Sequence, residues 1–179
     1  MNTLLGLAHL IDAVNERVGR ITIWLVLVAT LISAGNALAR YVLSDSSNAW
    51  LEIQWYLFGA IFLLGAGYTL KHNGHVRIDI VYGRLGPRGQ AWIDLLGGLF
   101  FLLPLAGLMA WLAWPIFLDS WRTMEYSSDS GGLLRWPVKL LLPLGFGLLA
   151  LQGVAEIIKR IGVLSGRYAM PVEKPAEDI

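Results

Sequence analysis

Four long runs without a charged residue constrain this chain more than any other feature of its sequence. They are Ile21 to Ala39, Ile53 to Leu70, Leu95 to Leu118 and Leu140 to Ala155. A helix needs about 20 apolar residues to cross the hydrocarbon core of a bilayer, at about 1.5 Å of rise each. Apolar neighbours extend the two shorter runs. The runs therefore predict four transmembrane helices over about residues 20–43, 49–72, 90–118 and 137–160.

Composition excludes a soluble protein with a large buried core. Of 179 residues, 56% are hydrophobic and 15% are charged, whereas a soluble domain is nearer a quarter charged. The net charge of +1 gives no reason to expect nucleic acid as a partner. We expect an all-α integral membrane protein, a bundle of four transmembrane helices with the lipid bilayer around it. Residues 1–165 should form a single membrane domain, and residues 166–179 a mobile cytoplasmic tail.

A cleaved signal peptide is the alternative interpretation of the first run. Ala37-Leu38-Ala39 has the small residues of a cleavage site. However, the apolar segment before it begins only at Ile21 and is longer than the core of a typical signal peptide. A transmembrane helix is the preferred interpretation.

The distribution of Lys and Arg predicts the orientation of the helices. Ten of these residues lie in the N-terminal tail, the second loop and the C-terminal tail, and four lie in the other two loops. Lys and Arg are enriched on the cytoplasmic side of membrane proteins. Both termini and the second loop are therefore expected to be cytoplasmic, with the first and third loops facing outward.

The segments beside the spans also carry signals. Residues 3–18 have apolar positions at helical spacing, which predicts an amphipathic helix lying in the cytoplasmic interface; a simple extension of the first span is the alternative. Asn73-Gly74 ends the second helix, and residues 78–85 should form a short interfacial helix. Ser127 to Gly132 is rich in turn residues and should form a flexible loop.

Residues that support chemistry within the membrane are not found in the sequence. There is no cysteine, and His9, His72 and His75 all lie outside the apolar runs. Because membrane haems are held by paired histidines, no haem is expected. No acidic residue occupies the middle of a span, where ion coupling usually needs one. The sequence predicts a scaffold that binds no cofactor or metal and is not an enzyme.

Small residues in the first span indicate close helix packing. Ala29, Ser33 and Ala37 recur every four residues, and Asn36 is the notably polar side chain of this span. Small side chains let helix backbones approach in lipid, and an asparagine there usually forms an interhelical hydrogen bond. We expect all four residues to contribute to helix packing.

Charged residues at the ends of the second span have two interpretations each. Glu52 either interacts with the positive end of its own helix or contacts another subunit. Lys71, His75 and Asp79 recur every four residues. They form either a solvated inner surface with a local ion pair or a surface for docking or gating.

Several segments together resemble one family of transporter subunits. They are Trp50-Leu51-Glu52, the stretch from Gly74 through His75 and Arg77 to Asp79, Arg135-Trp136-Pro137, Leu151-Gln152-Gly153 and the Glu156 to Arg160 segment. From Val18 to Arg160 the chain is similar to the small permease (DctQ-type) subunit of tripartite ATP-independent periplasmic (TRAP) transporters. The resemblance implies a subunit of the bacterial inner membrane that braces a large membrane subunit.

The same resemblance implies the partners and the transported solute. The large TRAP membrane subunit would move substrate with sodium, and a periplasmic substrate-binding protein would deliver an organic acid, with 2-oxo acids suggested by the tryptophan–proline segment. The outer loops would help to dock the binding protein. The partner-interface candidates are Trp50, Glu52, Lys71, His75, Arg77 and Asp79. The alternatives are a self-contained small oligomeric carrier and the membrane anchor of a redox complex.

Overall fold

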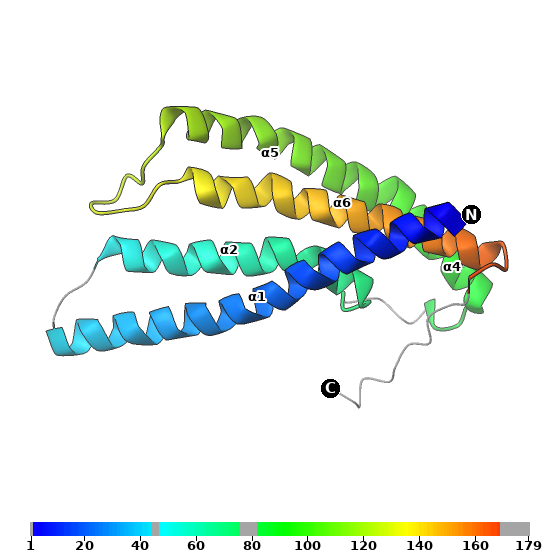
Figure 1. The fold of residues 1–179 in the computed structure, drawn as a ribbon, viewed down its shortest axis with the longest axis horizontal. Helices are drawn as coiled ribbons and strands as arrows, with labels where there is room; N and C mark the ends of the chain where they lie inside the picture. The colour runs from blue at the N-terminus through cyan, green and yellow to red at the C-terminus, as the bar shows by residue number, and fades with distance from the viewer. Residues whose placement is uncertain (1, 44–46, 76–81, 169–179) are drawn as a thin grey trace.

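The computed structural model describes residues 2–43, 47–75 and 82–168 (Figure 1). Its helices are α1 (Asn2–Leu43), α2 (Asn48–Lys71), α4 (Pro87–Gly97), the π-helical turn η1 (Gly98–Leu102), α5 (Leu103–Thr123) and α6 (Trp136–Leu164). Four helical segments are long and apolar enough to cross a membrane, because α4, η1 and α5 run on as one segment, Pro87–Thr123. The expected all-α membrane fold with four spans is therefore confirmed.

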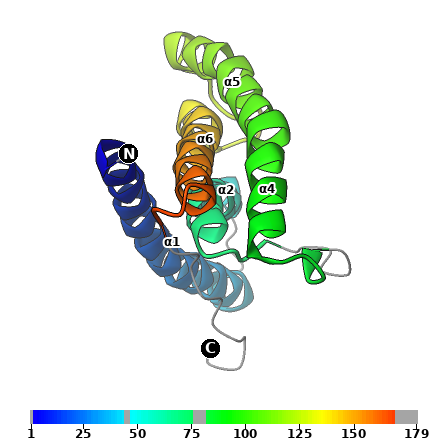
Figure 2. The same ribbon diagram turned by 90° about the vertical axis from the view of Figure 1, so that its right-hand side faces the viewer.

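α6 occupies the centre of the arrangement. It packs against α1, α2, α4, η1 and α5, and α1 and α2 also pack against each other. Figures 1 and 2 show α5 on one side of α6 and α1 on the other, so that the helices form a curved layer around α6. The interactions of α6 therefore decide how the two sides of the protein are held together.

The amphipathic N-terminal segment is helical as expected, and it continues into the first span without a break. α1 is 42 residues long, which corresponds to about 63 Å at 1.5 Å per residue. Ala8 and Ile11 are buried against Ala155 of α6. Leu4 and Leu7 remain about half exposed. No turn separates residues 3–18 from the first span. The backbone therefore agrees with the alternative interpretation, in which this segment is an extension of that span.

A π-helical turn interrupts the third span just before a proline. The backbone N–H of Leu103 donates to the carbonyl of Gly98, five residues earlier, and Pro104 follows. A proline cannot donate a backbone hydrogen bond, and its ring clashes with the carbonyl four residues before it. The wider turn accommodates this clash, so the segment stays helical through the proline.

Glycine allows α6 to approach α2 closely. A Cβ atom at Gly145 would lie 2.7 Å from Cβ of Leu63 and 2.8 Å from its carbonyl oxygen. Gly67 of α2 has the same function against Asn15, whose side chain is buried beneath it. Such contacts matter in lipid because no hydrophobic effect drives helices together there.

Gly145→Ala should therefore destabilise the protein, by about 1–3 kcal/mol for overpacking of a filled contact. The measurement is thermal unfolding of the purified protein in mild detergent. Gly147→Ala is the matched control, since a Cβ there meets no atom within 4 Å. Equal unfolding temperatures for the two variants would contradict close α2–α6 packing at Gly145.

Candidate functional site

One end of the molecule carries a loop that is tied to α2. Three residues of α2, spaced four apart on one face, hold the segment 124–135. Asn48 Nδ2 donates to the carbonyl of Ser130 at 3.0 Å, and Tyr56 Oη donates to that of Leu134 at 2.8 Å. Glu52 lies between them. We call these three residues and the segment 124–135 the loop clasp.

Glu52 is the centre of the loop clasp and is only 3% exposed. Its Oε2 accepts a hydrogen bond from the backbone N–H of Leu133 at 2.6 Å, and its Oε1 accepts one from Ser127 Oγ. Arg135 Nη2 lies 3.9 Å from Oε1. Gly132 leaves room for this carboxylate, because a Cβ there would lie 2.9 Å from Oε1. Glu52 thus fixes the fold of this loop within its own subunit.

Further contacts within the loop clasp connect it to α6. Arg135 Nη2 donates to Ser127 Oγ at 3.0 Å, and its guanidinium lies 5.4 Å from the centre of the Trp55 ring. Lys139 of α6 donates to Glu125, and this hydrogen bond lowers the pKa of the Glu125 carboxyl below its ordinary value of 4.5. The pair therefore contributes stability at neutral pH that is lost as the pH falls through that lowered pKa. The expected flexible loop is instead an ordered one, because a buried carboxylate and two backbone-binding side chains hold it.

A second polar region lies toward the other end of α6. Lys159 Nζ lies 3.1 Å from Asp12 Oδ1 of α1 and 2.6 Å from Glu156 Oε1. Gln152, which is fully buried, donates to Asp12 at 2.7 Å and to Glu156 at 3.0 Å. Lys159 itself is 8% exposed. These bonds fix the N-terminal half of α1 to α6.

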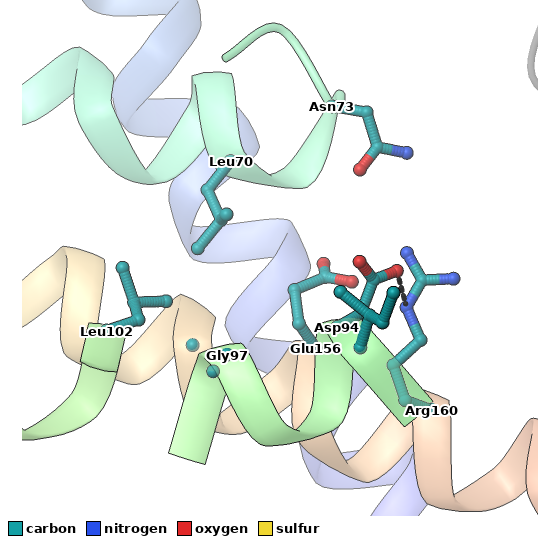
Figure 3. A pocket seen from close by; sticks show the side chains of 10 residues that line it. Leu70, Asn73, Asp94, Gly97, Leu102, Glu156 and Arg160 are labelled. Atoms are coloured by element: carbon teal, nitrogen blue, oxygen red, sulfur yellow. Dashed lines mark ion pairs between the residues drawn. The ribbon is translucent and has the colours of Figure 1, made fainter. Parts of the chain in front are cut away.

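Two more charged residues join α4 to the same end of α6. Arg160 Nε lies 3.1 Å from Asp94 Oδ2, and Arg160 is only 6% exposed. Tyr82 Oη donates to Asp94 at 2.9 Å. The charge cluster is the set Asp12, Asp94, Glu156, Lys159 and Arg160. Three of its members, Asp94, Glu156 and Arg160, line a cavity of about 270 Å³ between α2, α4 and α6 (Figure 3).

The partner-interface candidates fall in different environments. Trp50 is 52% exposed and His75 is exposed, whereas Glu52 is buried in the loop clasp. Lys71 Nζ lies 2.7 Å from Glu16 Oε2 of α1. Arg77 and Asp79 lie outside the described residues, as does the first half of the short helix expected over 78–85. The shared face of Lys71, His75 and Asp79 is therefore not described as a whole.

The packing candidates of the first span are divided between buried and exposed positions. Ala29 is 2% exposed and Asn36 is 8% exposed. Ser33 is half-buried, and its hydroxyl donates to Gln54 Oε1 of α2 at 2.9 Å. Ala37 is exposed. Ala29, Ser33 and Asn36 thus lie on the side of α1 that faces the protein.

The charge cluster was missed as a site in the sequence. A signal for it exists, since Gln152, Glu156 and Lys159 lie on one helical face next to an apolar run. The sequence does not indicate that Asp12 lies beside these residues, because Asp12 belongs to α1 and precedes Gln152 by 140 residues. For cofactors, no group of three His, Asp or Glu residues in the described ranges is placed to hold a metal ion.

These features define a multi-pass helical membrane protein whose charged side chains join its helices at both ends. Residues 29–162 match the family of tripartite ATP-independent periplasmic transporters, DctQ component. The match covers most of the chain, so the protein belongs to this family of TRAP transporter small permease subunits.

A curated relative agrees with this assignment. The chain is similar to the ectoine TRAP transporter small permease protein TeaB of Halomonas elongata, with 26% identity over 166 residues. The alignment covers 87% of this chain and 82% of the relative. No solved structure shows a significant match to the chain.

Glu52→Ala should loosen the loop clasp without unfolding the helices. The amide of Leu133 loses a charged acceptor, a bond that contributes about 1.5–3 kcal/mol, so its hydrogen exchange should accelerate tenfold or more, at about 1.4 kcal/mol per tenfold. Exchange measured by mass spectrometry on the loop peptide tests this. Asp129→Ala, at an exposed position of the same loop, is the control. Unchanged exchange in Glu52→Ala would show that Glu52 does not hold the loop.

Lys159→Met should be strongly destabilising, by about 3–5 kcal/mol, because it leaves the partly buried carboxylates of Asp12 and Glu156 without their cation. Adding Asp12→Asn removes one of those carboxylates. The double variant should therefore lose less stability than the sum of the two single variants. Chemical or thermal unfolding of all four proteins in the same detergent gives the coupling. Strictly additive losses would mean that the Asp12–Lys159 pair contributes nothing.

Proposed function

We propose that this chain is the small membrane subunit of a sodium-coupled, binding-protein-dependent TRAP transporter for an organic acid. The family match over residues 29–162 carries the proposal. The subunit lies in the bacterial inner membrane with both termini cytoplasmic, as the Lys and Arg distribution predicts. It works with a large TRAP membrane subunit that moves the substrate, and with a periplasmic binding protein that delivers it. Its own role is not enzymatic.

A scaffold role fits the way in which the helices are joined. The loop clasp ties α2 to the segment between α5 and α6, and the charge cluster ties α1 and α4 to α6. Polar bonds of this kind at the two ends of the molecule oppose sliding and rotation of the helices relative to each other. A transport subunit that changes shape needs a partner surface that does not, and this subunit is suited to supply one.

Apolar side chains are available for contact with the large subunit. Phe62 on α2 and Phe100 and Phe101 on η1 are each more than 60% exposed. In a membrane protein such side chains contact either lipid or another membrane subunit. We propose that part of this surface lies against the large TRAP subunit.

The loop clasp is the proposed contact for the periplasmic binding protein. It lies at the end that is expected to face outward, and its fold is fixed by Glu52. Trp50 beside it is 52% exposed, and Tyr126 within it is 66% exposed. An ordered loop loses little conformational entropy on binding. Lys71, His75, Arg77 and Asp79, at the expected inner end, remain candidates for contact with the large subunit.

The solute is proposed to be an organic acid, and a 2-oxo acid is the first compound to test. The similarity to TeaB, a protein of an ectoine transporter, adds ectoine to the compounds that should be compared. Binding studies on the periplasmic partner are the direct route, since that protein selects the solute.

The chain, purified from its native host in mild detergent, should co-elute with a large multi-span membrane protein in about equal amount. Liposomes containing this chain alone should not accumulate solute, whereas those containing both subunits and the binding protein should do so with a sodium gradient. Uptake by the chain alone would favour a self-contained carrier. A haem absorbance spectrum in the purified protein would favour a redox anchor.

Trp50→Ala provides a test of the proposed outer contact. It should reduce the stimulation of uptake by the binding protein while leaving the two membrane subunits associated. Trp111→Ala is the matched control, because Trp111 is an exposed tryptophan at 75% on α5, away from the loop clasp. Equal uptake in both variants would remove Trp50 from the docking surface.

A further inference from the structure

The cavity bordered by the charge cluster has one polar end and one apolar end. Figure 3 shows the carboxylates of Asp94 and Glu156 beside the guanidinium of Arg160, with Leu70 and Leu102 at the other end. The volume of about 270 Å³ corresponds to about nine water molecules at ~30 Å³ each. A space of this size and polarity suits an amphipathic ligand better than one or two ordered waters.

The polar end has unused bonding capacity. Both hydrogen bonds to Glu156 go to Oε1, so Oε2 accepts none from the described residues. Arg160 Nε lies 3.1 Å from Asp94 Oδ2, yet this buried nitrogen makes no hydrogen bond of good geometry in the described ranges. The two Nη groups of Arg160 make none there either. Arg160 is 94% buried, being 6% exposed. A charged side chain as buried as that of Arg160 normally has all of its hydrogen-bond partners.

The charge cluster also has an excess of negative charge. Three carboxylates, from Asp12, Asp94 and Glu156, share two cations, Lys159 and Arg160. Lys159 is already shared between Asp12 and Glu156. Within the described part of the chain the cluster therefore lacks one positive charge, and a charge that is largely removed from water without its counter-ion is costly. A cationic group in the cavity would supply it.

We propose that this cavity binds the headgroup of an amine-bearing phospholipid, phosphatidylethanolamine. Its ammonium group has three N–H donors for the carboxylates of Glu156 and Asp94. Its phosphate accepts from the free Nη groups of Arg160, since a guanidinium is well suited to phosphate oxygens. Its acyl chains leave along Leu70 and Leu102.

The position of the cavity supports a lipid rather than a water-soluble ligand. The cavity is lined by Leu70 and Asn73 at the end of α2 and by Ile93, Asp94 and Gly97 in the second half of α4. Helix ends of membrane proteins lie at the level of the lipid headgroups. Trp92 of α4 is 53% exposed, as is typical of tryptophans at that level. The inference concerns this subunit alone and does not depend on the transported solute or on the proposed transport function.

The test uses the full chain, together with whatever subunits purify with it, in nanodiscs made with equal amounts of phosphatidylethanolamine, phosphatidylcholine and phosphatidylglycerol. Native mass spectrometry counts the retained lipids. Phosphatidylethanolamine should be retained about fivefold or more over each of the others, about 1 kcal/mol by the binding relation. Phosphatidylcholine lacks N–H donors and phosphatidylglycerol lacks the amine. Retention without headgroup preference would overturn the proposal.

Gly97→Leu fills the cavity while leaving the charge cluster intact. Gly97 lines the cavity, and a Cβ there meets no atom within 4 Å. The variant should therefore fold and lose the preference for phosphatidylethanolamine. Gly107→Leu is the matched control, since Gly107 of α5 is equally free of neighbours within 4 Å and lies outside the cavity. Equal preference in the two variants would place the bound lipid elsewhere and overturn the assignment.

Two further outcomes separate other occupants. If soluble glycerophosphoethanolamine displaces the lipid at equal concentration, the acyl chains contribute nothing and a water-soluble ligand is the better assignment. If the lone subunit retains phosphatidylethanolamine but the complex with the large subunit does not, a side chain of that partner fills the cavity. Either result would contradict the lipid assignment.

Discussion

The ion pairs between α6 and its neighbours are the interactions on which the rest of this structure depends. In a bilayer, lipid tails are as apolar as leucine, so burying apolar surface between helices gives little stability. Helices must be held by close contact and by polar bonds. α6 has both, with Gly145 against α2 at its middle and Lys159 and Arg160 bonded to α1 and α4 near its end. Because every other helix packs on α6, these bonds determine the arrangement of the whole layer.

The loop clasp and the charge cluster stabilise different parts of the structure at the two ends of the molecule. Glu52 orders a loop from within, and it does so with one backbone amide and one hydroxyl as partners. The charge cluster instead connects three separate helices. A carboxylate bonded to a backbone amide can fix a loop locally, whereas charge pairs between side chains fix rigid elements relative to each other. A subunit with both arrangements presents an ordered loop on a stiff support, which is what a binding surface requires.

Sequence reasoning was most successful where the signal lies within one helix. The charge-free runs predicted four spans because length and apolarity alone decide whether a helix can cross a bilayer. It was less successful with contacts between distant segments. The i, i+4 and i+8 spacing of Asn48, Glu52 and Tyr56 was visible, but that this face meets residues 124–135 depends on tertiary packing. Asp12 lies in the segment 3–18, for which an interfacial helix was expected, and nothing local indicated Lys159 as its partner. The π-helical turn before Pro104 was also missed, since a proline predicts a kink equally well.

The separation of Asp12 from Lys159 along the chain has a consequence for biogenesis. The two residues are 147 positions apart, and a ribosome makes α2, α4 and α5 between them. Until α6 is made, Asp12 lacks the cation that pairs with it in the folded protein. The contact of the first half of α1 with the rest of the protein therefore stays incomplete while the intervening helices are made. The first half of α1 can form its ion pair with Lys159 only after α6 has been made. The fold is therefore completed only when its central helix has been synthesised.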